Sequence, residues 1–222
     1  MKDWSQSMYS PFNEFNTPKS HLLDKFPECV SYNITLIESK NTKERAKAQE
    51  VHLVSLNEVF EYSSKSDRCA VLVANISVPL LSTGKQAIAA WHVWHSDRFI
   101  SSFCARGLAT SDDTETLTIM EALGYLIDFV VDSISDIEEI HVFSDSMNAI
   151  HHSLDPSIHS VQSSAITMLS VLTPWMEENN NHRIIFHHVS DCEEYVFKPH
   201  CTVHNLATST KIECGLSASC FQ

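Results

Sequence analysis

Two acidic side chains occupy positions in which a protein can hold a divalent cation. Asp145 follows the apolar stretch 140–143, which has the character of a short buried strand, and precedes a segment with helical spacing. Glu115 lies near the start of a longer segment in which apolar residues recur every three or four positions, as on one face of a helix. Because Mg²⁺ draws much of its affinity from carboxylate oxygens, both residues are candidate metal ligands.

Each acidic residue also has a purely structural interpretation. Asp and Ser favour the position just before a helix, so Asp145, between Ser144 and Ser146, is also expected as a helix cap. An acidic residue in a first helical turn interacts favourably with the helix dipole, and Glu115 has that position. Residue type alone leaves both interpretations open.

The expected strands and helices follow an order that narrows the fold. Stretches 69–77, 87–94 and 99–104 are apolar or β-branched and are spaced like three consecutive antiparallel strands. A helix beginning at Ser111-Asp112-Asp113 comes next. It is followed by a strand at 140–143, helices at 146–154 and 161–176, a strand at 183–189 and a last helix at about 199–210. This order predicts an α/β fold with a mixed five-stranded sheet, in which three antiparallel strands precede strand–helix alternation and helices cover both faces.

In content and order, three segments resemble the ribonuclease H-like superfamily. The first is Phe143-Ser144-Asp145-Ser146, at the end of a strand and before a short helix. The second is 114–123, where Glu115 is followed by Ala and Leu seven and eight positions on. The third is His204-Asn205-Leu206-Ala207 in the last helix. The resemblance covers about 67–210, and the run from Leu206 to Thr210 (LATST) is similar to ribonuclease H domains of fungal, basidiomycete-type retroelements.

The resemblance implies an ancestral divalent-metal endonuclease that cuts RNA in RNA–DNA hybrids with Mg²⁺ or Mn²⁺ as cofactor. It implies that Glu115 and Asp145 are metal ligands. It also puts Asn75 where the family has a bridging Asp, and His204 where it has the last Asp. An Asn oxygen is neutral and cannot bridge two cations as a carboxylate does, and imidazole is a poor ligand for Mg²⁺. We therefore expect these four catalytic positions to support weak hydrolysis or none.

The charge of the chain favours an alternative from another functional class. The 222 residues include 15 Lys and Arg against 28 Asp and Glu, a formal net charge of −13. Nucleic-acid binding relies on basic side chains that displace counterions from phosphates, so an RNA–DNA hybrid would require a local basic face or bound cations. The alternative is a non-catalytic remnant of the fold that binds nucleic acid or protein. With 4 glycines in the chain, a Gly-rich phosphate-binding loop is excluded.

Histidines and cysteines gather near the end of the chain, at His187, His188, Cys192, His200, Cys201 and His204. Zinc sites usually combine two pairs with short internal spacing, and only Cys201 with His204 makes such a pair. A His-rich strand and helix end is the simpler interpretation. His200 is also a candidate substitute for the histidine that the family carries in the preceding loop, where it would act in proton transfer or product release.

Aromatic residues flank the expected hairpin. Trp91, Trp94 and Phe99 are suited to stacking on bases, although aromatics on adjacent strands more often pack in the core. His92 and His95 alternate with the tryptophans and are expected on the opposite, wetter face.

Sequence features also bear on location and domain organisation. No N-terminal stretch combines a positive start with an apolar run, and no apolar run approaches the roughly 20 residues that span a bilayer. We expect an intracellular protein, in the cytoplasm or nucleus, that is not secreted.

Three segments are predicted: a partly disordered N-terminal appendage of unknown function (1–66), a ribonuclease H-like domain (67–210) and a tail (211–222). Within the appendage, patterns at 30–37 and 51–60 predict one or two short strands or a helix.

Overall fold

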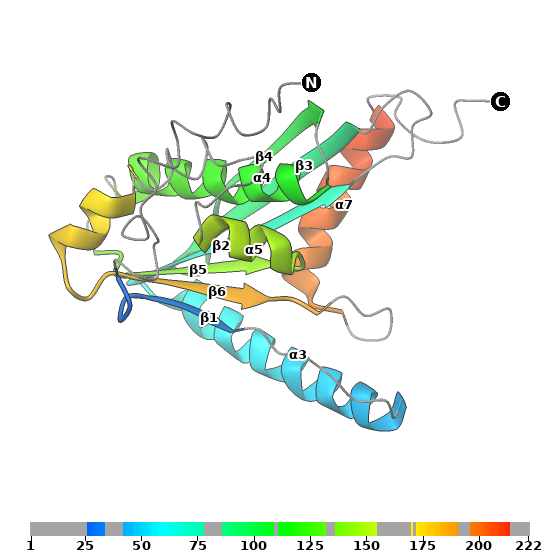
Figure 1. Cartoon of the computed structure of the whole chain (residues 1–222), viewed down its shortest axis with the longest axis horizontal. Helices are drawn as coiled ribbons and strands as arrows, with labels where there is room; N and C mark the ends of the chain where they lie inside the picture. The colour runs from blue at the N-terminus through cyan, green and yellow to red at the C-terminus, as the bar shows by residue number, and fades with distance from the viewer. Residues whose placement is uncertain are drawn as a thin grey trace, which may run out of the picture.

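A six-stranded sheet with helices on both faces forms the centre of the protein (Figure 1). The computed structural model describes residues 26–33, 42–77, 86–108, 111–131, 136–154, 170, 172–190 and 196–213. The strands are β1 (Val30–Asn33), β2 (Cys69–Ser77), β3 (Gln86–His95), β4 (Arg98–Leu108), β5 (Glu139–Ser144) and β6 (Arg183–His188). The described helices include α3 (Thr42–Lys65), α4 (Ser111–Tyr125), its π-helical continuation η2 (Leu126–Val131), α5 (Met147–Leu154) and α7 (Lys198–Glu213).

The strand order β1-β6-β5-β2-β3-β4 makes the sheet mixed. β2, β3 and β4 pair antiparallel, whereas β2 with β5, β5 with β6 and β6 with β1 pair parallel. The predicted α/β architecture is therefore confirmed, and all five predicted strands are present. The sixth strand is β1, which extends the sheet beyond β6.

β1 and α3 come from the segment that the sequence assigns to an N-terminal appendage. Val30 of β1 pairs in register with Ile184 of β6 and is buried. Leu56 of α3 is buried against the sheet. The sequence predicts one or two short strands or a helix in this segment, and one strand and one helix are present. Both contribute to the folded unit, because Val30 and Leu56 lie in the apolar cores. A domain division at residue 67 stays a prediction.

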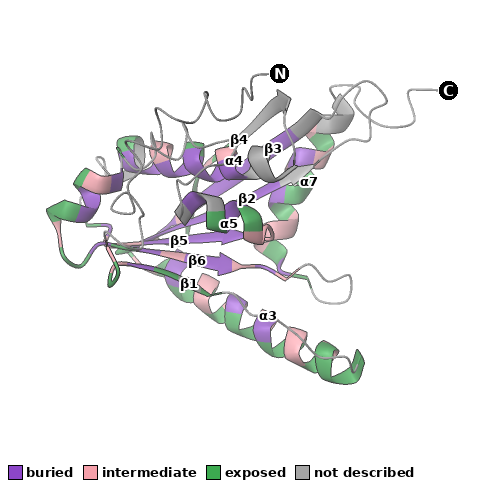
Figure 2. Cartoon of the chain, viewed as in Figure 1, coloured by how far each residue is buried: buried purple, intermediate pink, exposed green. Residues whose placement is uncertain are grey.

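Two apolar cores lie on opposite faces of the sheet, since side chains alternate along each strand. Figure 2 shows the buried residues gathered along the central strands and the helix faces. On β2, Ala70, Leu72 and Ala74 belong to the core shared with α4 and α5. Val71 and Val73 belong to the other core, to which α3 and α7 contribute. β2 is therefore buried from both sides, which explains its nearly continuous apolar sequence.

The β3–β4 hairpin turns tightly at Ser96 and Asp97, which have φ angles of 50° and 58°. Trp91 is 4% exposed and packs against Tyr125, so it belongs to the core. The prediction of a wetter face for His92 and His95 is wrong, because both are buried, at 8% and 7% exposure. β3 lies between β2 and β4 and has helices on both faces, so neither face of its centre meets solvent.

Several sequence predictions fall wholly or partly outside the described residues. Residues 172–178, which overlap the predicted helix at 161–176, are helical, and 161–169 and 171 lie outside. So do 1–25, the greater part of the predicted tail (214–222), and 191–195 in the loop that leads to α7. Among the described residues, no helix is both long and apolar enough to cross a lipid bilayer.

Candidate functional site

The parallel pairing of β2 and β5 brings Asn75 and Asp145 together. The two strands run in register from Cys69 opposite Glu139 onward, so residues 70 positions apart in sequence face each other. Asn75 lies near the carboxyl end of β2 and Asp145 directly follows β5. The Asn75 side chain donates a hydrogen bond from Nδ2 to Oδ2 of Asp145 over 3.4 Å. Asn75 is 1% exposed and the Asp145 side chain is 27% exposed, so the pair has a buried and a solvent-facing side.

Helix α7 places two histidines beside this pair. Val203 and Ala207 of α7 are buried in the core on the sheet, which fixes the rotation of the helix. His200 and His204 are four positions apart and therefore share one helix face. The ring Nδ1–H of His204 donates to Oδ1 of Asn75 over 3.1 Å. His204 and Asn75, two of the four predicted catalytic positions, are thus hydrogen-bonded to each other.

His200 contacts both members of the strand pair. Its Nε2 lies within hydrogen-bond reach of the Asn75 Nδ2 and 3.4 Å from Oδ2 of Asp145. When Nε2 is unprotonated it accepts from the Asn75 amide, and when protonated it donates to the Asp145 carboxylate. Sequence reasoning named His200 only as a substitute for a loop histidine. Its helical i, i+4 spacing from His204 was the signal that it shares the site.

The backbone around Asp145 is held by the end of β6, which helix α3 contacts in turn. The Val189 amide donates to the Ser144 carbonyl over 2.8 Å, and Nε2 of His188 bonds to the Asp145 carbonyl over 3.2 Å. Burial lowers the pKa of His188, so this ring is neutral near pH 7. His52 of α3 in turn bonds through Nε2 to the His188 carbonyl over 2.9 Å.

Ser146 performs the capping role that the sequence allowed for Asp145. The Ser146 Oγ accepts a hydrogen bond from the Ala149 amide over 3.1 Å, which is the N-cap contact of α5. The Ser146 amide donates to Ser144 Oγ, also over 3.1 Å. Because these serines form the turn, the Asp145 carboxylate is directed to Asn75 and His200.

Glu115 is the fifth residue of α4 and lies near the start of the helix, as the sequence predicts. Its side chain is outside the described residues, so its role as a metal ligand stays a prediction. Among the described residues, the histidines and Cys201 that the sequence offers for zinc do not form a metal-binding group. His187 stacks on Phe143, and His200 and His204 contact Asn75. Cys192 lies outside the described residues.

No family model matches the chain, and neither does any curated protein sequence. Solved structures do match. LC11-RNase H1, isolated from compost by a metagenomic approach, superposes with a TM-score of 0.50 at 13% identity, over 66% of this chain and 98% of its own. The fold is ribonuclease H-like.

Two further ribonuclease H structures show weaker similarity to this chain. One is LC11-RNase H1 in complex with an RNA/DNA hybrid, with a TM-score of 0.46 and 12% identity over 63% of this chain and 94% of that one. The other is the N-terminal RNase H domain of Rv2228c from Mycobacterium tuberculosis, with a TM-score of 0.42 and 14% identity over 63% and 97%. At these identities the similarity concerns the fold alone.

Proposed function

We propose that this chain is a ribonuclease H-like domain of retroelement origin whose ancestral, metal-dependent hydrolysis of RNA in RNA–DNA hybrids is weak or lost. One observation carries the proposal. Both terminal atoms of the buried Asn75 amide have partners within the protein: Oδ1 accepts from His204, and Nδ2 meets Asp145 and His200. The position at which the family resemblance requires a bridging carboxylate is instead the centre of a hydrogen-bonded cluster.

The donor set of this cluster does not fit a pair of Mg²⁺ ions. Two-metal phosphodiester hydrolysis requires a shared ligand that neutralises and bridges both cations. The Asn75 oxygen is neutral, and His204 already donates to it. Among the described side chains of the cluster, Asp145 is the one carboxylate, and the other members are an amide and two imidazoles. Mg²⁺ binds imidazole poorly and favours anionic oxygen, so this set supports at most weak binding of one ion.

Retroelement origin is supported by the run from Leu206 to Thr210 (LATST), which lies within α7 and resembles that group of ribonuclease H domains. The alternative function is a non-catalytic module that retains the fold to bind nucleic acid or protein. The formal net charge of −13 favours a protein partner within this alternative, because phosphates are repelled by an acidic surface.

The decisive experiment is cleavage of a labelled RNA–DNA hybrid in Mg²⁺ and in Mn²⁺. We expect no cleavage by the wild type above a protein-free control. We expect measurable cleavage by Asn75→Asp, and more by Asn75→Asp combined with His204→Asp, because these changes restore the carboxylates that the resemblance calls for. Cleavage by the wild type that disappears in Asp145→Asn would contradict the proposal.

The repaired variant also tests Glu115. Glu121 lies on the same helix and is exposed, so it provides a matched carboxylate control. In the Asn75→Asp background, Glu115→Gln should abolish the restored cleavage while Glu121→Gln should leave it unchanged. Equal effects of the two changes would remove Glu115 from the site. Fluorescence anisotropy with the same hybrid at low and high salt addresses the binding alternative, since phosphate contacts weaken as salt rises.

A further inference from the structure

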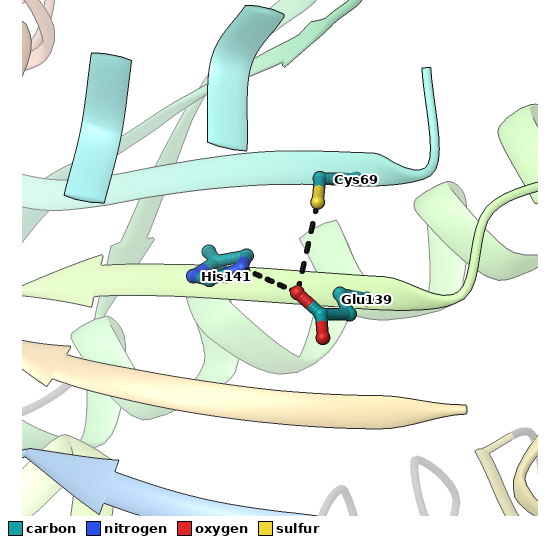
Figure 3. Close-up of side chains that lie close together, drawn as sticks. All are labelled: Cys69, Glu139 and His141. Atoms are coloured by element: carbon teal, nitrogen blue, oxygen red, sulfur yellow. Dashed lines mark hydrogen bonds and ion pairs between the residues drawn. The ribbon is translucent and has the colours of Figure 1, made fainter. Parts of the chain in front are cut away.

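Three side chains with metal-ligating atoms meet at the opposite end of β2 and β5 from Asn75 and Asp145 (Figure 3). Cys69 is the first residue of β2, and Glu139 is its partner at the start of β5. His141 lies two positions after Glu139 and therefore on the same face of the sheet. A strand rises about 3.3 Å per residue, so Cys69 lies roughly 20 Å along the strand direction from Asn75, and His141 lies roughly 13 Å from Asp145.

Two distances within the cluster lie close to the edges of a zinc tetrahedron. The Cys69 Sγ lies 3.7 Å from Oε2 of Glu139, and Nε2 of His141 lies 3.3 Å from the same oxygen. All three ligand atoms lie within 4.8 Å of one another. With zinc bonds of about 2.3 Å to sulfur and about 2.0 to 2.2 Å to nitrogen and oxygen, the sulfur–oxygen and nitrogen–oxygen edges are about 3.6 and 3.4 Å. The two distances that end on the Glu139 oxygen are therefore close to those of a zinc site.

A second layer of side chains orients the His141 ring. Its Nδ1 lies 3.0 Å from Nε2 of His187, and the two rings stack with an interplanar angle of 4°. His187 is bonded in turn to the Asn33 side chain of β1 over 3.4 Å. Burial lowers the pKa of His141, so the ring is neutral near pH 7 and can offer a lone pair. Metal-binding histidines are commonly fixed in this way through the ring nitrogen that does not bind the metal.

Burial and access also suit a metal centre. Cys69 is 1% and His141 5% exposed, whereas the Glu139 side chain is 32% exposed. A cation and a water molecule therefore have a route past Glu139 while sulfur and nitrogen stay shielded. Burial raises the pKa of the Cys69 thiol, so without metal the thiol is protonated and can donate to Glu139. Metal binding would release that proton and replace the hydrogen-bonded triad with coordination bonds.

We propose that Cys69, Glu139 and His141 bind one Zn²⁺ ion, with a water molecule as the fourth ligand. A thiolate and an imidazole favour Zn²⁺ over Mg²⁺, and the carboxylate reduces the charge of the ion. The ion would join the first residue of β2 to the start of β5, which lies 70 positions later in the chain. The proposal does not depend on nuclease activity or its loss, because none of the three ligands belongs to the Asn75 cluster.

The full chain, stripped of metal with a chelator, provides the test. Isothermal titration with Zn²⁺ should show one equivalent per chain. Titration with Co²⁺ in its place should give a thiolate-to-cobalt charge-transfer band together with the visible absorption of a four-coordinate ion. Cys69→Ser should abolish the charge-transfer band. Glu139→Gln should weaken Zn²⁺ binding more than about 100-fold, since ligand loss exceeds the roughly 10- to 100-fold effect of losing an outer partner.

Glu138→Gln is the matched control for Glu139→Gln. Glu138 is the adjacent carboxylate and pairs with Arg68 instead, so its substitution should leave Zn²⁺ affinity unchanged. Circular dichroism establishes which variants are folded. If Cys69→Ser does not fold, Glu139→Gln serves as the test of the proposal, because the Glu139 side chain is partly exposed and its substitution should be tolerated. A folded wild type that takes up no Zn²⁺, or a cobalt–thiolate band that survives in Cys69→Ser, overturns the proposal. Equal weakening by Glu138→Gln and Glu139→Gln overturns it as well. No nucleic acid is present, so the result is independent of hybrid cleavage.

Discussion

The Asn75 amide donates from Nδ2 to the Asp145 carboxylate over 3.4 Å, and this contact joins the carboxyl ends of two neighbouring parallel strands. An amide can lie against a carboxylate because it presents a proton, whereas a second carboxylate would repel the first. The contact therefore makes the site stable without a cation. This relationship sets the first prediction.

Asn75→Asp should make stability depend on divalent cations. The substitution preserves shape but replaces a buried donor with a like charge, so we expect a loss of about 1 to 3 kcal/mol in metal-free buffer. Mg²⁺ at millimolar concentration should raise the melting temperature of the variant, because binding to the folded state alone is stabilising. Differential scanning calorimetry with and without Mg²⁺ measures both effects. An equal rise in the melting temperature of the wild type with Mg²⁺ would show that the native cluster already binds the ion.

Helix α3 should contribute to global stability in spite of its place in the predicted appendage. Leu56 is 3% exposed in the core formed with α7, so Leu56→Ala should cost about 2 to 5 kcal/mol. Val54 on the same helix is 52% exposed, and Val54→Ala should change stability by about 0.5 kcal/mol or less. Urea denaturation gives both values. If Leu56→Ala lowers stability as little as Val54→Ala, α3 is only loosely attached to the sheet.

Acid should destabilise the fold through His187. Burial lowers the pKa of His187 from 6.5 to about 3, and His141 and His52 nearby add to the effect when charged. Between these pH values the unfolded chain binds a proton at this position that the folded chain excludes, so stability is fully present above about pH 6.5 and decreases as pH falls. This group contributes a slope of up to about 1.4 kcal/mol per pH unit.

The measurement is urea denaturation from pH 7 to pH 5 in the presence of a chelator. His187→Phe should flatten the pH dependence, because phenylalanine keeps the stack on Phe143 and does not titrate. His151 on α5 is exposed, so His151→Gln should leave the slope as in the wild type. An unchanged slope in His187→Phe would assign the acid sensitivity to other groups.

The same His187→Phe variant should weaken zinc binding by about 10- to 100-fold, because the ring of His141 loses its partner at Nδ1. Isothermal titration with Zn²⁺ at pH 7 measures the change. The cobalt–thiolate band should survive, since Cys69 remains a ligand. Affinity equal to the wild type would show that packing alone orients His141.

Much of the fold was accessible from sequence because apolar periodicity reports burial directly. β2 and β5 were predicted from their β-branched runs, and α7 was predicted from 199 to 210 against the observed Lys198–Glu213. β1 was suggested by alternation, yet nothing local reveals that it pairs with β6. The burial of His92 was also inaccessible, because polarity suggested solvent whereas the neighbouring strands and helices cover β3.

Sequence reasoning found individual residues of the candidate site more readily than their contacts. Asn75, Asp145 and His204 were named by resemblance, and the structure places them in one cluster. The Cys69–Glu139–His141 cluster has no short sequence spacing, because Cys69 lies 70 positions from Glu139 in the chain. Its local signal, a Glu and a His two apart on one strand, is weak until the register of β2 against β5 brings a cysteine beside it.

The pairing of β1 with β6 has a consequence for synthesis of the protein. Asn33 and His187 lie on these adjacent strands although they are 154 positions apart in the chain. During translation, β1 therefore cannot pair with its partner until β6 has emerged from the ribosome. Contacts of such long range close slowly, and unpaired strands are prone to wrong partners in the interval. The yield of folded protein in a cell should accordingly respond to translation speed and to chaperones that shield the early strand.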